Sequence, residues 1–131
     1  MIYMLDTNIC IYVINSRPEK VLERFRQERL GDIGISSITA AELAFGVAKS
    51  GSVRNRQALD MVLCTLEILP FDESVIWHYG SLRTDLERRG QPIGALDTMI
   101  AAHALATDMI LVTNNTREFD RVLGLRLENW A

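Results

Sequence analysis

Cysteine is scarce in this sequence, and long apolar runs are absent. The 131 residues include only two cysteines, Cys10 and Cys64, each in apolar surroundings, so we expect no disulfide framework and predict that both thiols are buried. No segment approaches the roughly 20 apolar residues of a membrane span. The amino terminus also lacks the basic segment of a secretory signal. We therefore expect a cytoplasmic protein with no membrane association.

Several widespread catalytic motifs are missing as well. The chain has no G-x-x-x-x-G-K-[ST] or G-x-G-x-x-G phosphate loop and no G-x-S-x-G nucleophile turn. His78 and His103 are far apart in sequence, which argues against the closely spaced ligands of a zinc site. We interpret His103 as a structural histidine with hydrogen-bond partners, the alternative being an auxiliary role near a site.

The charge balance argues against a protein whose whole surface binds nucleic acid. The net charge is −3, although a local basic rim around an acidic site remains compatible with it. Arginine supplies 12 of the 14 basic residues, and arginine is the better bidentate ligand for phosphate. Arg17 and Arg117 are candidates for phosphate contacts, while most arginines are expected to lie on solvated helix surfaces.

Strand-like and helix-like segments alternate along the chain, which predicts one α/β domain over residues 1–131 with a mainly parallel sheet. Apolar residues make up 48% of the sequence, enough for a folded core. Strands are predicted at 2–6, 33–36, 67–71, 109–113 and 125–130. Helices are predicted at 8–15, 19–29, 38–49, 53–66, 73–89 and 97–107, with a loop or short helix at 116–123.

Smaller signals give details of these elements. Pro70 predicts that the third strand lies at a sheet edge, and Gly31 is expected to end the second helix. For the helix at 38–49, the spacing predicts a packing face of five residues, namely Ile38, Ala41, Leu43, Phe45 and Val47.

Three acidic residues stand where a strand ends or a helix begins: Asp6, Glu42 and Asp97. Each has a structural explanation. Asp6 and Asp97 are suitable N-caps for the helices that follow them, and Thr39 with Glu42 matches a capping box.

Taken together, the three carboxylates predict a metal site. Each lies in an apolar context, and carboxylates that share a half-buried sheet edge repel one another unless a cation or a proton is present. Oxygen-only clusters select hard cations such as Mg²⁺ or Mn²⁺. Such an ion activates water and neutralises charge on a scissile phosphate, so phosphodiester hydrolysis is the expected chemistry.

Four segments carry the candidate site residues, in chain order Met4 to Asn8, Ser36 to Gly46, Gly94 to Ala104, and Leu111 to Phe119. Together they resemble the four motifs of PIN-domain ribonucleases, and especially of VapC-type toxins. The resemblance spans nearly the whole chain. It implies a three-layer α/β/α sandwich with a central, mainly parallel sheet, and a Mg²⁺- or Mn²⁺-dependent endoribonuclease.

The resemblance also assigns site residues. Asp6, Glu42 and Asp97 fall on the metal-binding acidic positions of the family, and Thr113 matches its supporting hydroxyl. Asn115 stands where many relatives carry Asp. This departure implies one well-held ion, with the Asn115 amide accepting a metal-bound water.

The residues around these positions complete the candidate site. Glu118 or Asp120 is an alternative source of the missing fourth charge. Thr7 and Asn8 are positioned to hold Asp6 or a bound water.

The resemblance further implies a substrate and partners. Proteins of this kind cut structured RNA in a single-stranded loop, where unstacked bases are accessible, and so inhibit translation. The expected substrate is tRNA, with initiator tRNA as the first choice. The expected partners are a VapB-type antitoxin that inserts an arginine or a bulky tail near the acidic cleft, and a second copy of the chain bound through the helix at 38–49 or 53–66.

Two other functions are compatible with the residues. Asn115 in place of a carboxylate would suit a catalytically weak PIN-fold module that binds RNA or a partner. A DNA nuclease of the flap-endonuclease type is the second alternative, but the chain has no room for a helical arch or a DNA-binding extension.

Overall fold

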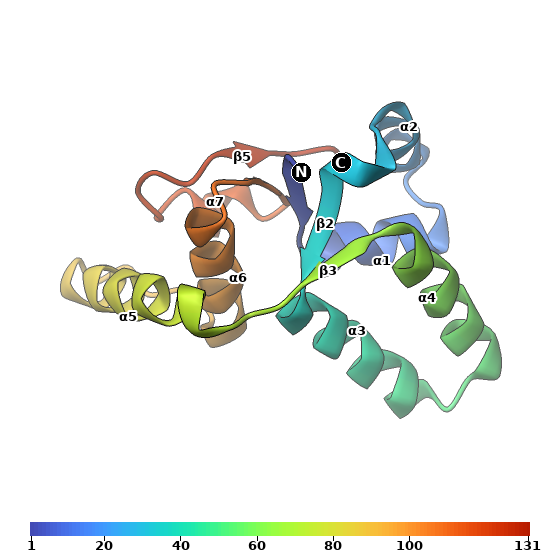
Figure 1. The fold of residues 1–131 in the computed structure, drawn as a ribbon, viewed down its shortest axis with the longest axis horizontal. Coiled ribbons are helices and arrows are strands. Elements are labelled where there is room, and N and C mark those ends of the chain that lie inside the picture. The colour runs from blue at the N-terminus through green and yellow to red at the C-terminus, as the bar shows by residue number, and fades with distance from the viewer.

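Five parallel strands form the centre of the molecule in the order β3-β2-β1-β4-β5. The computed structural model describes residues 1–131, and Figure 1 shows the sheet between two groups of helices. The strands are β1 (Tyr3–Leu5), β2 (Ile33–Ser36), β3 (Glu67–Leu69), β4 (Ile110–Val112) and β5 (Leu127–Glu128). All five lie within the predicted strand segments, and β3 lies at an edge as Pro70 predicted.

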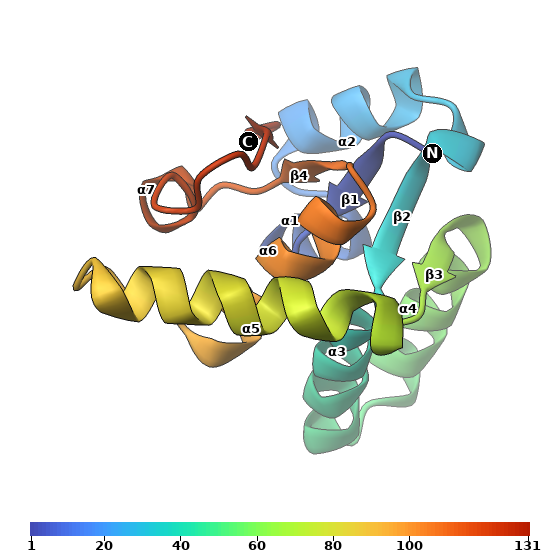
Figure 2. The same ribbon diagram turned by 60° about the vertical axis from the view of Figure 1, so that its left-hand side comes forward.

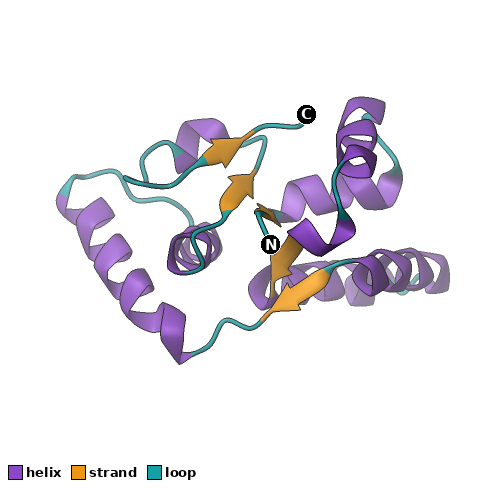
Figure 3. Cartoon of the chain, turned by 45° about the horizontal axis from the view of Figure 1, so that its top comes forward, coloured by secondary structure: helices purple, strands orange, loops and turns teal.

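Seven α-helices connect and cover the strands; Figure 3 colours the helices purple and the strands orange. They are α1 (Thr7–Asn15), α2 (Glu19–Gln27), α3 (Ser37–Ser50), α4 (Val53–Thr65), α5 (Glu73–Arg88), α6 (Ala95–Ala106) and α7 (Thr116–Phe119). Helices α3 and α4 form a hairpin that projects beyond the sheet in two views (Figures 1 and 2). No helix is long and apolar enough to cross a membrane.

The alternation of side chains along the strands creates two apolar layers. Successive residues of a strand point to opposite faces of the sheet. Met4 and Leu111 therefore pack on one face with α5, α6 and α7, whereas Leu5 and Val112 pack on the other face with α1 to α4. This is the predicted three-layer α/β/α sandwich.

Two local predictions, the end of the second helix and the packing face of α3, are wrong. The second helix ends at Gln27, and Gly31 lies inside a separate 3-10 turn at Leu30–Asp32. In α3, Ala41 and Phe45 are exposed. The packing face is instead the row at four-residue intervals formed by Thr39, Leu43 and Val47, because only one side of α3 contacts the rest of the molecule.

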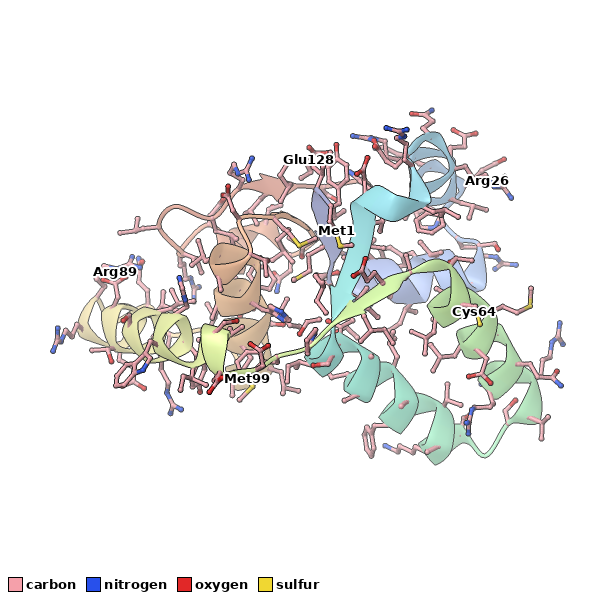
Figure 4. All side chains as sticks on the ribbon, in the orientation of Figure 1. Met1, Arg26, Cys64, Arg89, Met99 and Glu128 are labelled. Carbon is pink, nitrogen blue, oxygen red and sulfur yellow. The ribbon has the colours of Figure 1, made fainter.

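Of the two cysteines, only Cys10 is buried as predicted. Cys64, labelled in Figure 4, is exposed on α4. The inward side of α4 is occupied by Leu59, with Val62 and Leu63 partly buried against the same core. Cys64 follows Leu63 by one residue, which in a helix is a turn of about 100° away from the core.

Gly34 occupies the most crowded position in β2. A Cβ there would lie 2.7 Å from the Met1 sulfur and 3.0 Å from the carbonyl oxygen of Glu67. Because Glu67 is the paired residue on β3, its carbonyl cannot move without disturbing the sheet. We expect Gly34→Ala to lower the free energy of unfolding by about 1–3 kcal/mol, measured by urea denaturation.

Gly46 in α3 provides the matched control, since a Cβ there meets nothing within 4 Å. Gly46→Ala should raise the free energy of unfolding by about 0.5–1 kcal/mol, as expected for Ala replacing Gly inside a helix. Equal effects of the two substitutions would contradict this account of β2 packing.

Candidate functional site

The candidate site lies at the carboxyl ends of the two central strands. Leu5 of β1 pairs with Val112 of β4, so the residues that follow, Asp6 and Thr113, leave the sheet side by side. The backbone N–H of Asp6 donates to the Val112 carbonyl at 3.0 Å. The connection from β1 leads to β2 on one side while β4 lies on the other, which makes this crevice the switch point where open α/β sheets bind ligands.

Asp6 is buried, with 5% of its surface exposed, and it is tightly held. It is the N-cap of α1, and its Oδ1 accepts the backbone N–H of Ile9 at 2.9 Å. Burial raises the pKa of Asp6, the charge of Glu42 adds to that rise, and the Thr113 hydroxyl and two backbone N–H groups oppose it. Asp6 is thus a helix cap and also a member of an acidic cluster.

Glu42 reaches the site from α3 and bonds across to the start of α1. The Thr7 hydroxyl donates to Glu42 Oε1 at 2.9 Å. The interpretation of Thr39 and Glu42 as a capping box is wrong, because the N-cap of α3 is Ser36. The Thr39 hydroxyl is buried without a hydrogen-bond partner.

Asp97 lies in the first turn of α6, where the N-cap position belongs to Gly94. The N-cap interpretation of Asp97 is therefore wrong, and its carboxylate is free for the site. Burial and the negative charges of Glu118, Asp6 and Glu42, in that order, raise the pKa of Asp97 to about 6. The three predicted acidic residues therefore come together and act on one another electrostatically.

The turn after β4 supplies the fourth side of the cluster. The Asn115 backbone N–H donates to the Thr113 hydroxyl at 2.9 Å, and the Asn115 side-chain amide donates to Glu118 Oε2 at 2.8 Å. Among the neighbouring carboxylates, Glu118 raises the pKa of Asp97 the most. Asp120 is exposed at the end of α7 and does not contribute to the cluster.

The supporting residues differ in detail from the sequence expectation. Thr7 holds Glu42 rather than Asp6. The side chain of Asn8 is exposed, and only its backbone N–H acts on Asp6. The partner of Thr7 could not be found from the sequence, because Glu42 lies 35 residues further along the chain. The hydrogen bond between Asn115 and Glu118 could have been predicted from the sequence, because a donor and an acceptor stand three residues apart at the start of a helix.

The donor set fits a divalent ion that retains water ligands. Asp6, Glu42, Asp97 and Glu118 present only hard oxygen atoms, and none of them forms an ion pair with a basic side chain. No three acidic, histidine or cysteine side chains are close enough together to hold an ion between them directly. Mg²⁺ is commonly bound by one or two carboxylates plus water and substrate phosphates, which suits such an open cluster.

His103 is a structural residue, as predicted. It is 1% exposed, and its Nδ1 forms a 2.8 Å hydrogen bond with the Ser36 hydroxyl. The Phe71 ring packs edge-on against it with centroids 5.6 Å apart. Burial lowers the pKa of His103, so the neutral ring is favoured and links α6 to the end of β2.

The fold and the site define the class of protein: a parallel α/β/α sandwich whose acidic side chains gather at the switch point of the sheet. Residues 3–125 match the PIN domain family model, and the chain belongs to the PIN-domain family. Within it, the chain is a VapC-type ribonuclease, as its motifs predicted.

Individual relatives support this placement over the full length of the chain. It is 45% identical over 130 residues to the tRNA(fMet)-specific endonuclease VapC of Shigella flexneri, covering 98% of each protein. It is 48% identical over 132 residues to ribonuclease VapC2 of Rickettsia felis, covering 99% of this chain and 98% of the relative. The solved structure of DNA-bound VapBC from Salmonella typhimurium matches with a TM-score of 0.92 at 41% identity, covering 100% of this chain and 99% of the other.

Proposed function

We propose that this chain is a Mg²⁺- or Mn²⁺-dependent endoribonuclease whose site consists of Asp6, Glu42 and Asp97, with Glu118 as the fourth carboxylate. The observation that carries the proposal is the uncompensated charge of the cluster. Burial, and then the charges of three other carboxylates, raise the pKa of Asp97 to about 6. Such mutual repulsion is the expected state of a site prepared for a cation.

Neighbouring groups of the chain hold the carboxylates of the site in place. Asp6 is fixed by the Ile9 N–H, and Glu42 is oriented by the Thr7 hydroxyl. When bound, a divalent ion supplies a water of lowered pKa and neutralises charge on the scissile phosphate. Without a cation the carboxylates repel phosphate, so RNA binding and cation binding are expected to be coupled. Below about pH 6 Asp97 holds a proton, and cation binding should release it.

The proposed substrate is tRNA, cut within a single-stranded loop and with initiator tRNA preferred, so that translation is inhibited. Two observations support this choice. The Shigella flexneri relative is named for tRNA(fMet), and proteins that recognise RNA by sequence mostly bind single-stranded loops, where unstacked bases can be splayed out. Arg117 is exposed one residue before Glu118, whereas Arg17 lies beyond the carboxyl end of α1, the end that points away from Asp6. Arg117 is thus the better candidate for a phosphate contact.

A panel of tRNA transcripts tests the substrate. With Mg²⁺ present, initiator tRNA should be cut at one position in a loop, and elongator tRNAs should be cut at least tenfold more slowly. Equal rates for all tRNAs would contradict the preference, and cuts confined to base-paired stems would contradict the single-stranded target.

We further propose that a VapB-type antitoxin occupies the groove between α1, α3 and α4. The groove has a volume of about 250 Å³ and is lined at one end by Thr7 and Glu42. Its apolar lining is Ile11, Ile14, Leu43, Val47 and Leu59. An apolar tail with an arginine directed at Glu42 suits this lining. Several structurally similar proteins are themselves VapBC complexes.

A single charge in this groove should weaken antitoxin binding. Ile11 is 40% exposed and lines the groove, so Ile11→Lys places an ammonium group in an apolar contact. We expect about a tenfold or greater loss of affinity, measured by calorimetry with the antitoxin encoded beside the gene. Ile76→Lys is the control, since Ile76 is 50% exposed on α5, outside the groove. Equal losses for both variants would contradict the assignment.

The homodimer also belongs to this proposal. Phe45 on α3 and Met61 on α4 are 68% and 73% exposed, and these are the two helices from which a dimer surface was expected. Exposed large apolar side chains on neighbouring helices favour association. Light scattering should give twice the chain mass, and Phe45→Glu should shift the protein toward the monomer.

A further inference from the structure

Asn115 connects the two halves of the acidic cluster. Its backbone N–H is held by the Thr113 hydroxyl at 2.9 Å, and the same hydroxyl acts on Asp6. Its side-chain amide donates to Glu118 Oε2 at 2.8 Å. One turn after β4 therefore fixes the position of Glu118 relative to Asp6.

The Asn115 amide donates to the Glu118 carboxylate whatever the pH, whereas the Asp97 carboxyl hydrogen-bonds to Glu118 only while Asp97 holds a proton. Glu118 is half-buried and forms no ion pair. A lysine or arginine in this place would hold the carboxylate and also neutralise it. A neutral amide holds it while leaving its full charge available to a cation.

We propose that Asn115 is a positioning residue whose amide fixes Glu118 as the fourth carboxylate of the site, and that Asn115 does not itself contact the ion or its water. This inference rests on the proposed metal site. It replaces the expectation that the Asn115 amide accepts a metal-bound water.

A double-mutant cycle tests the proposal. Mn²⁺ affinity is measured by calorimetry on the metal-free full chain for wild type, Asn115→Leu, Glu118→Gln and the double variant. Leu matches the shape of Asn but cannot donate. Each single substitution should weaken Mn²⁺ binding about tenfold or more, the usual effect of losing a residue that orients a ligand. The double variant should bind no more weakly than Glu118→Gln alone, because Asn115 acts only through Glu118.

Asn114 provides a matched control, because its side-chain amide donates to the Tyr12 hydroxyl at 2.7 Å. Asn114→Leu should leave Mn²⁺ affinity within twofold of wild type. Asn115→Ser, whose side chain is too short to reach Glu118, is measured beside Asn115→Leu and replaces it if Asn115→Leu does not fold. Additive losses in the cycle, or wild-type affinity in both Asn115 variants, would overturn the positioning role alone. Failure of the wild-type chain to bind Mn²⁺ would overturn the proposed metal site and this inference with it.

Discussion

Asp97→Asn should reduce RNA cleavage by roughly 10²–10³-fold while the fold is retained. The substitution keeps the size of the side chain and removes the charge that faces Asp6, Glu42 and Glu118. Loss of a few kcal/mol of transition-state stabilisation corresponds to about this factor. Asn is tolerated in a first helical turn, so α6 should form normally. Asp6→Asn should behave alike, because Asn is an equally good N-cap for α1.

Asp120→Asn is the matched control for these variants. Asp120 is an exposed acid two residues after Glu118 and outside the cluster, so its replacement should change the cleavage rate by less than twofold. Initial rates on the same tRNA, with circular dichroism to verify folding, measure all three variants. Near wild-type cleavage by Asp97→Asn would remove Asp97 from the proposed site.

Asp97→Asn should also make the metal-free protein more stable than wild type at pH 7.5, and it should have no such effect near pH 4. The pKa of Asp97 is about 6 in the folded chain, against about 3.9 when unfolded. Below pH 4 Asp97 is protonated in both the folded and the unfolded state, and the stabilisation that its raised pKa represents is fully present. As the pH rises through 6, the folded state loses its favoured protonated form and stability falls. Asn resembles the protonated form at every pH and avoids this loss.

Urea unfolding in EDTA measures this difference. At pH 7.5 the variant should exceed wild type by on the order of 1–2 kcal/mol, a value reduced for the partial exposure of the carboxylate. Adding Mg²⁺ should raise the free energy of unfolding of wild type, since an ion that binds only the folded state stabilises it. The difference in stability between the variant and wild type should therefore become smaller. A gap of the same size at both pH values would show that the repulsion at Asp97 does not control stability.

The sheet and the location of the site could be predicted because both follow from local patterns. The short apolar runs ending at Leu5 and Val112 indicate parallel strands. Adjacent parallel strands bring the residues that follow them, Asp6 and Thr113, to one edge. The chain itself contains no information of this kind about the position of Asp97, which was placed there by the family resemblance.

The remaining features depend on contacts between distant parts of the chain. Phe45 was expected to pack and is 68% exposed, because helical periodicity does not identify which side of a helix meets a neighbour. The bond from Thr7 to Glu42 joins residues 35 positions apart. The choice of Glu118 over Asp120 depended on the direction in which α7 leaves the turn, since Asp120 falls on its exposed side.

Cleavage of RNA that requires a divalent cation is the central claim, and one incubation tests it directly. The purified full chain is mixed with initiator tRNA or with single-stranded DNA, each in Mg²⁺ and in EDTA, and the products are separated on a denaturing gel. We expect the tRNA to be cut in Mg²⁺, EDTA to stop the cleavage, and the DNA to stay intact in both. Cleavage of tRNA that persists in EDTA, or intact tRNA in Mg²⁺ or Mn²⁺, would contradict the claim.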